Sequence, residues 1–257
     1  ISIFYHDFGK IIPKFQIDIL GNKDYTPFDV IYEIPHSLFS IFWIDEEKIK
    51  EKFSDEKLLN FIISAVAYHH WRENFESVIS NRDEDLKRFI DKVLNEWKCE
   101  FKKKLKNEFS NFSESEYKDL KDFIKDIKIN ENRLKEVKNG CYIYEYAVPP
   151  YKSDYYPVRE ILTRSFEEQK EWILISGFLQ RCDSFASFCE EENGDINKIE
   201  IHPVEFNDVK NKVIKKIELE ENKIWQIQKL DSNKDKNIIL VAPTGYGKTE
   251  FAFLWGT

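Results

Sequence analysis

Apolar residues recur at helical spacing along most of the chain. Between 83 and 109 they follow steps of three and four residues, which predicts an amphipathic helix. Residues 56–71 are apolar on nearly all sides and predict a buried helix, and the helical period returns from about 158 to 191. Two loops are expected between or after these stretches, at the proline-punctuated 148–157 and at the turn-like 191–203. The pattern predicts a mainly α-helical bundle.

The pattern changes towards the end of the sequence. KNIILVAPTGYGKTEFAF, at 236–253, is a short apolar run followed by a glycine-containing loop and the start of a helix. That order is typical of an α/β domain, so we expect the first β-strand and phosphate loop of such a domain here. The predicted organisation is a helical domain at 1–205, a linker at 206–235 and the start of a second domain at 236–257.

Composition narrows the class of protein. Of the 257 residues, 42% are hydrophobic and 15% aromatic, so the chain can bury a substantial core. The net charge of −8 argues against a surface that is basic throughout, although it leaves room for a local basic groove. The sequence contains no apolar run long enough to cross a bilayer and no recognisable secretion signal, and its four cysteines lack CxxC spacing. We therefore expect a cytoplasmic protein without membrane partners.

The chain begins at Ile1 and contains no methionine, so we expect it to be part of a longer protein. Histidine is scarce, with five residues in all. Four of these lie in or beside apolar runs, in the motifs HDFGK, IPHSLF and VAYHHW: His6, His36, His69 and His70. A single histidine in such a setting is ordinarily a core residue with its hydrogen bonds satisfied, or part of a solvated helix end. Four such histidines, one of them followed directly by Asp7, indicate a shared site.

Asp183 lies among apolar residues of a predicted buried helix, where a carboxylate needs a cation, hydrogen bonds or a metal. A salt bridge to Arg181 or Lys170 is the structural alternative. Imidazole and carboxylate ligands suit Mn, Fe, Co, Ni or Zn better than Ca. Because neighbouring side chains on a helix diverge by about 100°, His69 and His70 fit a pair of ions or a distorted turn. Asp7 could bridge two ions, as two-metal phosphodiester hydrolysis requires.

The ordered set HDFGK, HSL, HH and a late Asp resembles the HD-domain metal-dependent phosphohydrolases. Over residues 1 to about 200 it looks most like the HD nuclease domain of the CRISPR-associated nuclease-helicase of type I systems. The resemblance implies two divalent ions (Mn, Co, Ni, Fe or Mg), one held by His6, Asp7 and Asp183. It implies that Asp7, His36, His69 and His70 hold the other ion, and that Lys10 lies near the scissile phosphate. That family has a further histidine upstream, which either precedes Ile1 or is missing, leaving the first site defective.

APTGYGKTE, at 242–250, has the chemistry of a phosphate-binding loop. Backbone amides around Gly245 and Gly247 would surround phosphates at a helix N-terminus, Lys248 would neutralise phosphate oxygens, and Thr249 would reach Mg²⁺. The stretch resembles motif I of superfamily 2 helicases, which implies ATP with Mg²⁺ as ligand. Gln228, or its neighbour Gln226, would then be the adenine-reading glutamine; the alternative is an ordinary exposed side chain.

These features predict an enzyme that hydrolyses single-stranded DNA phosphodiesters with metal ions, in either endonuclease or exonuclease mode. By the resemblance it is the nuclease part of a nuclease-helicase whose partner is the RNA-guided CRISPR surveillance complex, with ATP-dependent helicase activity only in the full-length protein. Two alternatives stay open. One is an HD phosphohydrolase acting on nucleotides, and the other is a catalytically degenerate module that docks DNA or the complex.

Overall fold

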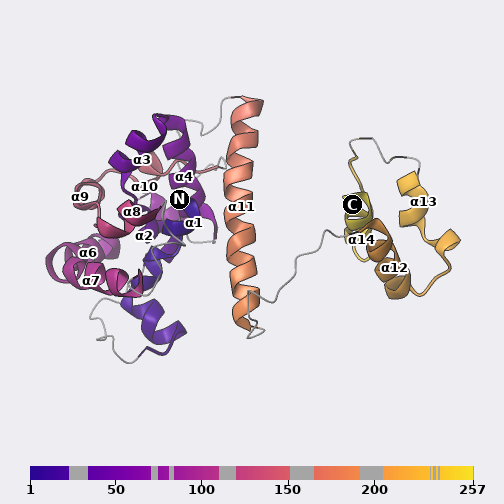
Figure 1. Ribbon diagram of the computed structural model, residues 1–257, viewed down its shortest axis with the longest axis horizontal. Coiled ribbons are helices and arrows are strands. Elements are labelled where there is room, and N and C mark those ends of the chain that lie inside the picture. The colour runs from indigo at the N-terminus through magenta and orange to yellow at the C-terminus, as the bar shows by residue number, and fades with distance from the viewer. Residues whose placement is uncertain are drawn as a thin grey trace. The chain divides into compact units, whose positions relative to one another are not determined.

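The protein is described from a computed structural model, which divides into two compact units, Ile1–Glu192 and Asn193–Thr257 (Figure 1). Each unit is described by itself. The residues that the structure describes are 1–22, 34–70, 75–80, 84–109, 120–150, 165–191, 205–231, 233, 236 and 238–256.

Helices dominate the first unit, as the periodicity predicted. Its α-helices are α1 (Ser2–Tyr5), α2 (His36–Ser40), α3 (Glu46–Phe53), α4 (Glu56–Tyr68), α5 (Phe75–Ile79), α6 (Glu84–Lys92), α7 (Lys98–Phe109), α8 (Lys121–Lys125), α9 (Glu131–Lys138), α10 (Ile143–Tyr146) and α11 (Phe166–Glu191). Its 3₁₀ and π turns are η1 (Phe8–Ile11), η2 (Phe15–Ile19), η3 (Ile41–Trp43) and η4 (Val93–Trp97). The mainly helical class is confirmed, since the described residues contain no strand.

The apolar helix α4 is the centre of the first unit. Its N-terminus is capped by Asp55, whose Oδ1 accepts a hydrogen bond from the backbone N–H of Lys57 at 2.8 Å. Nearly every residue from Leu59 to Tyr68 is buried, because α4 packs against α1, α2, α3 and α11. In Figure 1, α11 runs as a single long helix beside α4 at the edge of the bundle. Helix α4 therefore connects α1, α2, α3 and α11 within one core.

The amphipathic stretch predicted at 83–109 is helical from Glu84 to Phe109, with the π turn η4 between α6 and α7. Its apolar stripe enters the core shared with α2 and η3, where Phe39, Phe89 and Phe101 are fully buried. The loop expected at 148–157 is described only to residue 150, which is not helical, and the loop expected at 191–203 lies almost entirely outside the described residues.

The second unit contains α12 (Phe206–Ile217), η7 (Glu221–Lys223), α13 (Trp225–Asp231) and α14 (Lys248–Trp255). Residues 206–235, expected as a linker, supply α12 and α13, which pack on α14 around a small core of Val213, Ile224, Ile227, Leu230 and Leu254. The strand expected before the glycine loop is not formed: described residues 238–243 are irregular, and Ile239 and Val241 are almost fully exposed. A strand requires a neighbouring strand to hydrogen-bond with, and none lies in the described part of the chain.

Among the described residues, no helix combines the length and apolar character that crossing a bilayer requires.

Candidate metal centre

Six side chains from five separate elements meet at one end of α4. His6 follows the last residue of α1, Asp7 precedes η1, His36 begins α2, His69 and His70 follow α4, and Asp183 lies on α11. The packing of α1 on α4 and α11, and of α2 on η1 and α4, brings these elements together. The structure therefore brings together every metal ligand proposed from the sequence.

His6, Asp7 and Asp183 form one group whose potential ligand atoms all lie within 4.8 Å of one another. The Nε2 atom of His6 is 3.1 Å from Oδ2 of Asp7 and 3.6 Å from Oδ1 of Asp183. His6 and Asp183 are mostly buried, with side chains 13% exposed. Neither Arg181 nor Lys170 is the partner of Asp183; Lys170 instead pairs with Glu167 at 3.0 Å. The position of Asp183 is therefore explained by the histidines.

His36, His69 and His70 form a second group with the same spacing limit of 4.8 Å. Helix α4 ends at Tyr68, so the two adjacent histidines lie in the turn that follows it. The rings of His69 and His70 are 4.2 Å apart between centroids, and both lie within 6 Å of the His36 ring, at 5.8 and 5.5 Å. The turn therefore allows two consecutive side chains to face the same point, which a continuing helix would prevent.

Both carboxylates connect the two groups. Asp7 directs Oδ2 towards His6 and Oδ1 towards His36, whose Nε2 is 3.7 Å away. Asp183 shows the same arrangement, with Oδ1 facing His6 and Oδ2 lying 3.2 Å from Nε2 of His70. The sequence suggested a bridging position for Asp7 but assigned Asp183 to one group only. The second link could not be foreseen, because it depends on how α11 docks against α4.

Two of the histidines have their ring orientation fixed by the backbone. Nδ1 of His6 is 2.6 Å from the carbonyl oxygen of Ile3, and Nδ1 of His69 is 2.7 Å from that of Val66. Since a carbonyl oxygen only accepts, each Nδ1 must be the protonated donor, which leaves the lone pair on Nε2. Metal-binding histidines ordinarily have this arrangement. It directs Nε2 of both rings into the site.

Burial keeps two of the rings neutral. The pKa of His36 is lowered to about 3 and that of His69 to about 4, mainly by burial, with the neighbouring histidines acting in the same direction. Burial also opposes charge on His6, but the hydrogen bond and negative charge of Asp7, with Asp183, raise its pKa overall. Asp7 itself is partly buried, yet His6 and Lys10 hold the pKa of its carboxyl well below the usual range. At neutral pH, His36 and His69 are thus neutral imidazoles beside the Asp7 carboxylate, the forms that metals require.

Three buried atoms in the centre have no hydrogen-bond partner in the described protein: Oδ1 of Asp7, Nε2 of His36 and Nε2 of His69. Leaving such groups unsatisfied in the interior costs about 1–3 kcal/mol each. All three atoms belong to residues of the two groups. The other buried side-chain atoms without a partner among the described residues are Oγ of Ser37 and Ser64 and Nε1 of Trp43 and Trp172, which are hydroxyl and indole groups and not imidazole or carboxylate ligands. Nitrogen and carboxylate donors arranged in this way fit a first-row divalent metal.

Two residues that sequence reasoning did not assign hold the HDFGK turn against α2. A Cβ atom on Gly9 would lie 1.8 Å from the backbone oxygen of His36, so only glycine permits this approach. The backbone N–H of Gly9 donates to Oγ of Ser40 at 2.8 Å, and that hydroxyl lies 2.6 Å from the carbonyl oxygen of His6. Ser40 is fully buried, but Ser37 in the same HSLFS helix is buried too, so the sequence alone gave no signal that distinguished Ser40.

Lys10 lies on the exposed side of the centre. Its Nζ donates to Oδ2 of Asp7 at 2.6 Å and lies 5.7 Å from the centre of the Phe15 ring. The side chains of Lys10 and Asp7 are 34% and 31% exposed, in contrast to the buried His36 and His69. The centre is therefore accessible beside Lys10, and also beside His70, whose side chain is 37% exposed.

The predicted phosphate loop lies in the second unit, where a cavity of about 680 Å³ is lined by Gly245, Gly247, Lys248, Thr249 and Gln226 among others. Gly247 has φ +75°, a left-handed conformation that favours glycine, and its Cα lies close to the side chain of Gln226. Lys248 begins α14 and donates to the carbonyl oxygens of Ala242 and Pro243 at 2.7 and 3.0 Å.

The two candidate glutamines have different surroundings. Gln226 is buried, and its Nε2 lies 3.3 Å from the carbonyl oxygen of Tyr246 in the loop. Gln228 is exposed, donates to the carbonyl oxygen of Asn222 and does not line the cavity. The structure therefore places Gln226, and not Gln228, beside the phosphate loop.

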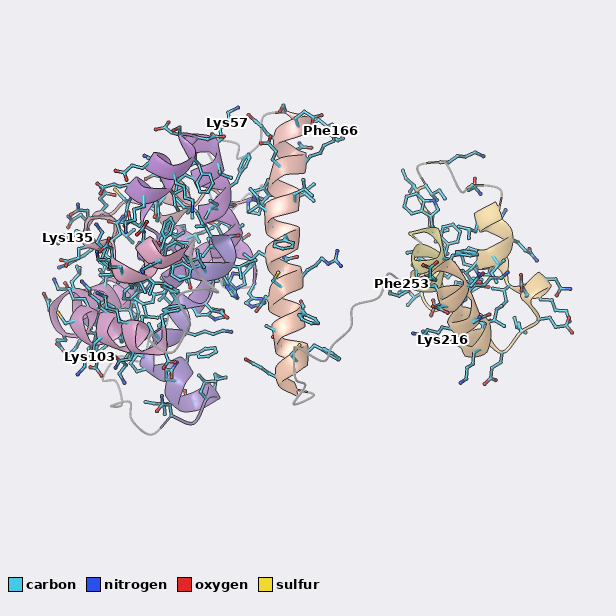
Figure 2. The ribbon with its side chains drawn as sticks, in the orientation of Figure 1. Lys57, Lys103, Lys135, Phe166, Lys216 and Phe253 are labelled. Carbon is cyan, nitrogen blue, oxygen red and sulfur yellow. The ribbon has the colours of Figure 1, made fainter. Side chains whose placement is uncertain are left out.

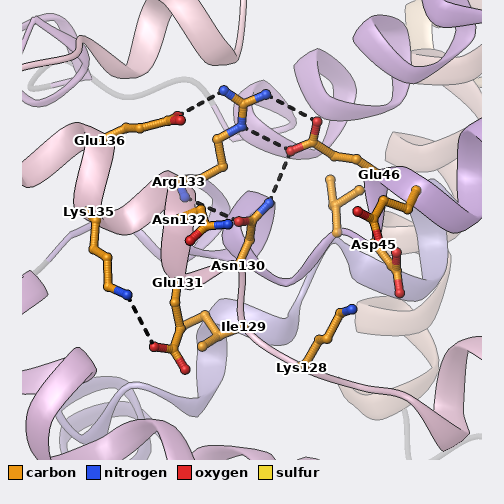
Figure 3. Close-up of a pocket in the computed structure, with 12 residues that line it drawn as sticks. Asp45, Glu46, Lys128, Ile129, Asn130, Glu131, Asn132, Arg133, Lys135 and Glu136 are labelled. Atoms are coloured by element: carbon orange, nitrogen blue, oxygen red, sulfur yellow. Dashed lines mark hydrogen bonds and ion pairs between the residues drawn. The ribbon is translucent and has the colours of Figure 1, made fainter.

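A further hollow of about 540 Å³ lies between α3 and α9 (Figure 3). Its central side chain is Arg133, which contacts Glu46 through Nε at 3.0 Å and Nη2 at 3.2 Å, and Glu136 through Nη1 at 2.9 Å. Asn130 adds a hydrogen bond to Glu46 at 3.1 Å. The charges and hydrogen bonds of these side chains are satisfied by one another, so the contacts in this hollow join α3 to α9.

Comparison with known proteins found one informative similarity. The chain is 26% identical over 283 aligned residues to the CRISPR-associated nuclease/helicase Cas3 of Methanothermobacter thermautotrophicus (strain Delta H). The alignment covers 97% of this chain and 30% of that protein, so the chain spans less than a third of the length of its relative. No family model matches the chain, and no solved structure matches it significantly. The similarity extends over both units and agrees with a protein related to a CRISPR-associated nuclease.

Proposed function

We propose that the first unit is an HD-type nuclease that hydrolyses phosphodiester bonds of single-stranded DNA with two divalent metal ions. The observation that carries the proposal is the set of three buried atoms without hydrogen-bond partners, all of which belong to residues of the two adjoining candidate ligand groups. A purely structural histidine cluster would satisfy these atoms internally. The similarity to a nuclease/helicase supports the choice of a DNA phosphodiester as substrate.

His6, Asp7 and Asp183 would hold one ion, and His36, His69 and His70 would hold the other. Each carboxylate also faces a histidine of the second group, Asp7 facing His36 and Asp183 facing His70. Two divalent ions would supply Lewis acidity and a water made acidic enough to attack phosphorus. Because imidazoles bind metals in the neutral form, the two carboxylates would offset only half of the charge of two divalent ions, which favours an anionic substrate. Lys10, on the accessible side, would bind a non-bridging phosphate oxygen.

In the second unit, the phosphate loop would bind the phosphates of ATP with Mg²⁺ through Lys248 and Thr249, with Gln226 beside the loop. Translocation along DNA would need more of a helicase than these residues provide and would belong to a longer protein. By the resemblance of its motifs, such a protein would act on DNA strands exposed by an RNA-guided CRISPR surveillance complex, and similarity to a CRISPR-associated nuclease/helicase supports a role in that system.

Cleavage of a circular single-stranded DNA tests the proposal. We expect nicking with Mn²⁺ that needs no ATP and stops with EDTA. Asp7→Ala should abolish cleavage at any metal concentration and lower metal content, because Asp7 faces both groups. Asp122→Ala, which removes an exposed aspartate on α8, is the matched control and should cut at the wild-type rate. Cleavage by a folded Asp7→Ala protein that still binds two ions would refute the mechanism.

A further inference from the structure

A hollow of about 420 Å³ opens directly beside the metal centre. Asp7 and Lys10 form one wall of it, and residues from η2 and α7 form the others. The volume falls within the range of small-ligand sites, about 300–1,000 Å³. Its position means that a molecule bound there would touch the side of the centre that is accessible from solvent.

The polar lining of the hollow is rich in hydrogen-bond donors. Lys10 and Lys104 contribute ammonium groups, and Gln16, Asn22 and Asn107 contribute amides; Glu108 is the one acidic side chain besides Asp7 among the described lining residues. Gln16 donates to the carbonyl oxygen of Lys10 at 2.8 Å and accepts from Asn22 at 3.1 Å, so this amide pair is held in place. Such a surface complements phosphate oxygens.

Two of the described lysines line this hollow. Lys10 belongs to the HDFGK motif, whereas Lys104 lies far from that motif in the sequence. It lies on α7 one turn before Asn107, so both side chains occupy one face of the helix. Lys104 is three-quarters buried, lies 3.6 Å from Glu100 on its own helix and is one of the residues that line the hollow. Lys103, labelled in Figure 2, is exposed and does not line the hollow.

No aromatic side chain is among the described residues that line the hollow. A site for a free nucleotide or a base ordinarily includes a ring or an apolar surface on which the base stacks. A row of lysines and amides without such a ring suits the sugar-phosphate backbone, whose contacts position a strand without reading its sequence.

We propose that this hollow binds the DNA backbone next to the bond that is cut, with Lys104 as a phosphate contact on the far wall. The inference rests on the proposed nuclease function, and it adds the path of the substrate strand and a strand-binding residue outside the metal motif. Because contact is to phosphate, the contribution of Lys104 should be the same for every base sequence.

Binding of fluorescent single-stranded oligonucleotides, measured by anisotropy in EDTA over a range of salt concentrations, tests Lys104 without cleavage. Loss of one phosphate contact should flatten the plot of log affinity against log salt by about 0.7. We expect Lys104→Ala to show this change and to weaken oligo(dT) and mixed-sequence strands by the same factor. Lys104→Glu should weaken binding further, and Lys103→Ala, which removes an equal charge from the same helix, should match wild type.

A salt slope for Lys104→Ala equal to that of wild type, or equal losses for Lys103→Ala and Lys104→Ala, would overturn the proposal. Circular dichroism of each variant shows whether it is folded, and Lys104→Glu gives a second measurement if Lys104→Ala is not. Hydrolysis of bis(4-nitrophenyl) phosphate by the wild-type protein with Mn²⁺ tests the metal centre separately, because this small diester does not extend along the hollow. Failure of that reaction would refute the nuclease function, whereas failure of the salt test would refute only the strand path.

Discussion

Replacing Gly9 with alanine tests how closely the metal motif must approach α2. In the structure an added Cβ would lie 1.8 Å from the backbone oxygen of His36, whereas real contacts of this kind essentially never fall below 3.0 Å. The HDFGK turn and the start of α2 must therefore separate by at least 1.2 Å (3.0 − 1.8). The atom in conflict is backbone, so no side-chain rotation can relieve it.

The size of this shift predicts a larger loss of activity than of stability. Forcing extra volume into a packed interior costs about 1–3 kcal/mol in unfolding free energy. The same movement takes His36 away from Asp7, whose facing atoms are 3.7 Å apart. Metal–ligand distances tolerate only about 0.2 Å, and a misplacement of about 1 Å can reduce a rate about 100-fold. We therefore expect at least that loss in metal-dependent cleavage.

Gly177→Ala is the matched control, because a Cβ at this position on α11 would meet nothing within 4 Å. Alanine is favoured over glycine inside a helix by about 1 kcal/mol, so this variant should be as stable as wild type or more stable. Urea denaturation, bound Mn²⁺ and cleavage of circular single-stranded DNA should be measured on the same preparations. A Gly9→Ala protein with wild-type metal content and cleavage rate would show that the contact with His36 is not needed to build the centre.

Three further substitutions follow from the described contacts. His70→Ala should lower metal affinity on the order of 10- to 100-fold, and raising Mn²⁺ should partly restore cleavage, since His36 and His69 remain; loss that no metal concentration rescues would contradict this. Ser40→Ala should reduce unfolding free energy by about 1–3 kcal/mol in urea, because the buried N–H of Gly9 loses its acceptor; an unchanged midpoint would argue against it. Lys248→Ala should weaken MgATP binding about tenfold or more by calorimetry, and equal affinity would remove the loop from nucleotide binding.

The sequence predicted the helical class and the six residues that lie together at the candidate centre, and physical reasons explain why. Helical spacing is informative in α4 and α7 because each packs at least one side into the core. Helix α11 instead packs on α4 and α1, and its Ile173, Leu174 and Phe178 are exposed, so it is less buried than the sequence predicted. Histidine is scarce in this chain, so its repeated occurrence beside apolar residues was informative without any knowledge of the fold. Neither helical spacing nor the positions of the histidines in the sequence depends on how the helices pack against one another.

The features that the sequence did not predict depend on tertiary contacts. Asp183 reaches His70 as well as His6 only because α11 lies along α4. Gln226 and Gln228 are two residues apart and so point to nearly opposite sides of a helix, and only the packing of α13 on α14 decides which one meets the loop. The strand expected at 238–242 also depends on tertiary contacts, because a strand needs a neighbouring strand for its hydrogen bonds. The described residues contain no such neighbour, and the strand is not formed among them.

The accessibility of the centre is uneven, and this constrains how a substrate could enter. His36 and His69 are closed off by the core, and the carbonyl contact of His69 fixes the direction of its ring. Lys10, by contrast, is partly exposed and lines the hollow that leads towards α7. A phosphodiester arriving from solvent would thus meet a cation before it reached the buried imidazoles. The buried side can then hold metal ligands rigidly while the open side accepts strands of any sequence, a division that suits a nuclease without base specificity.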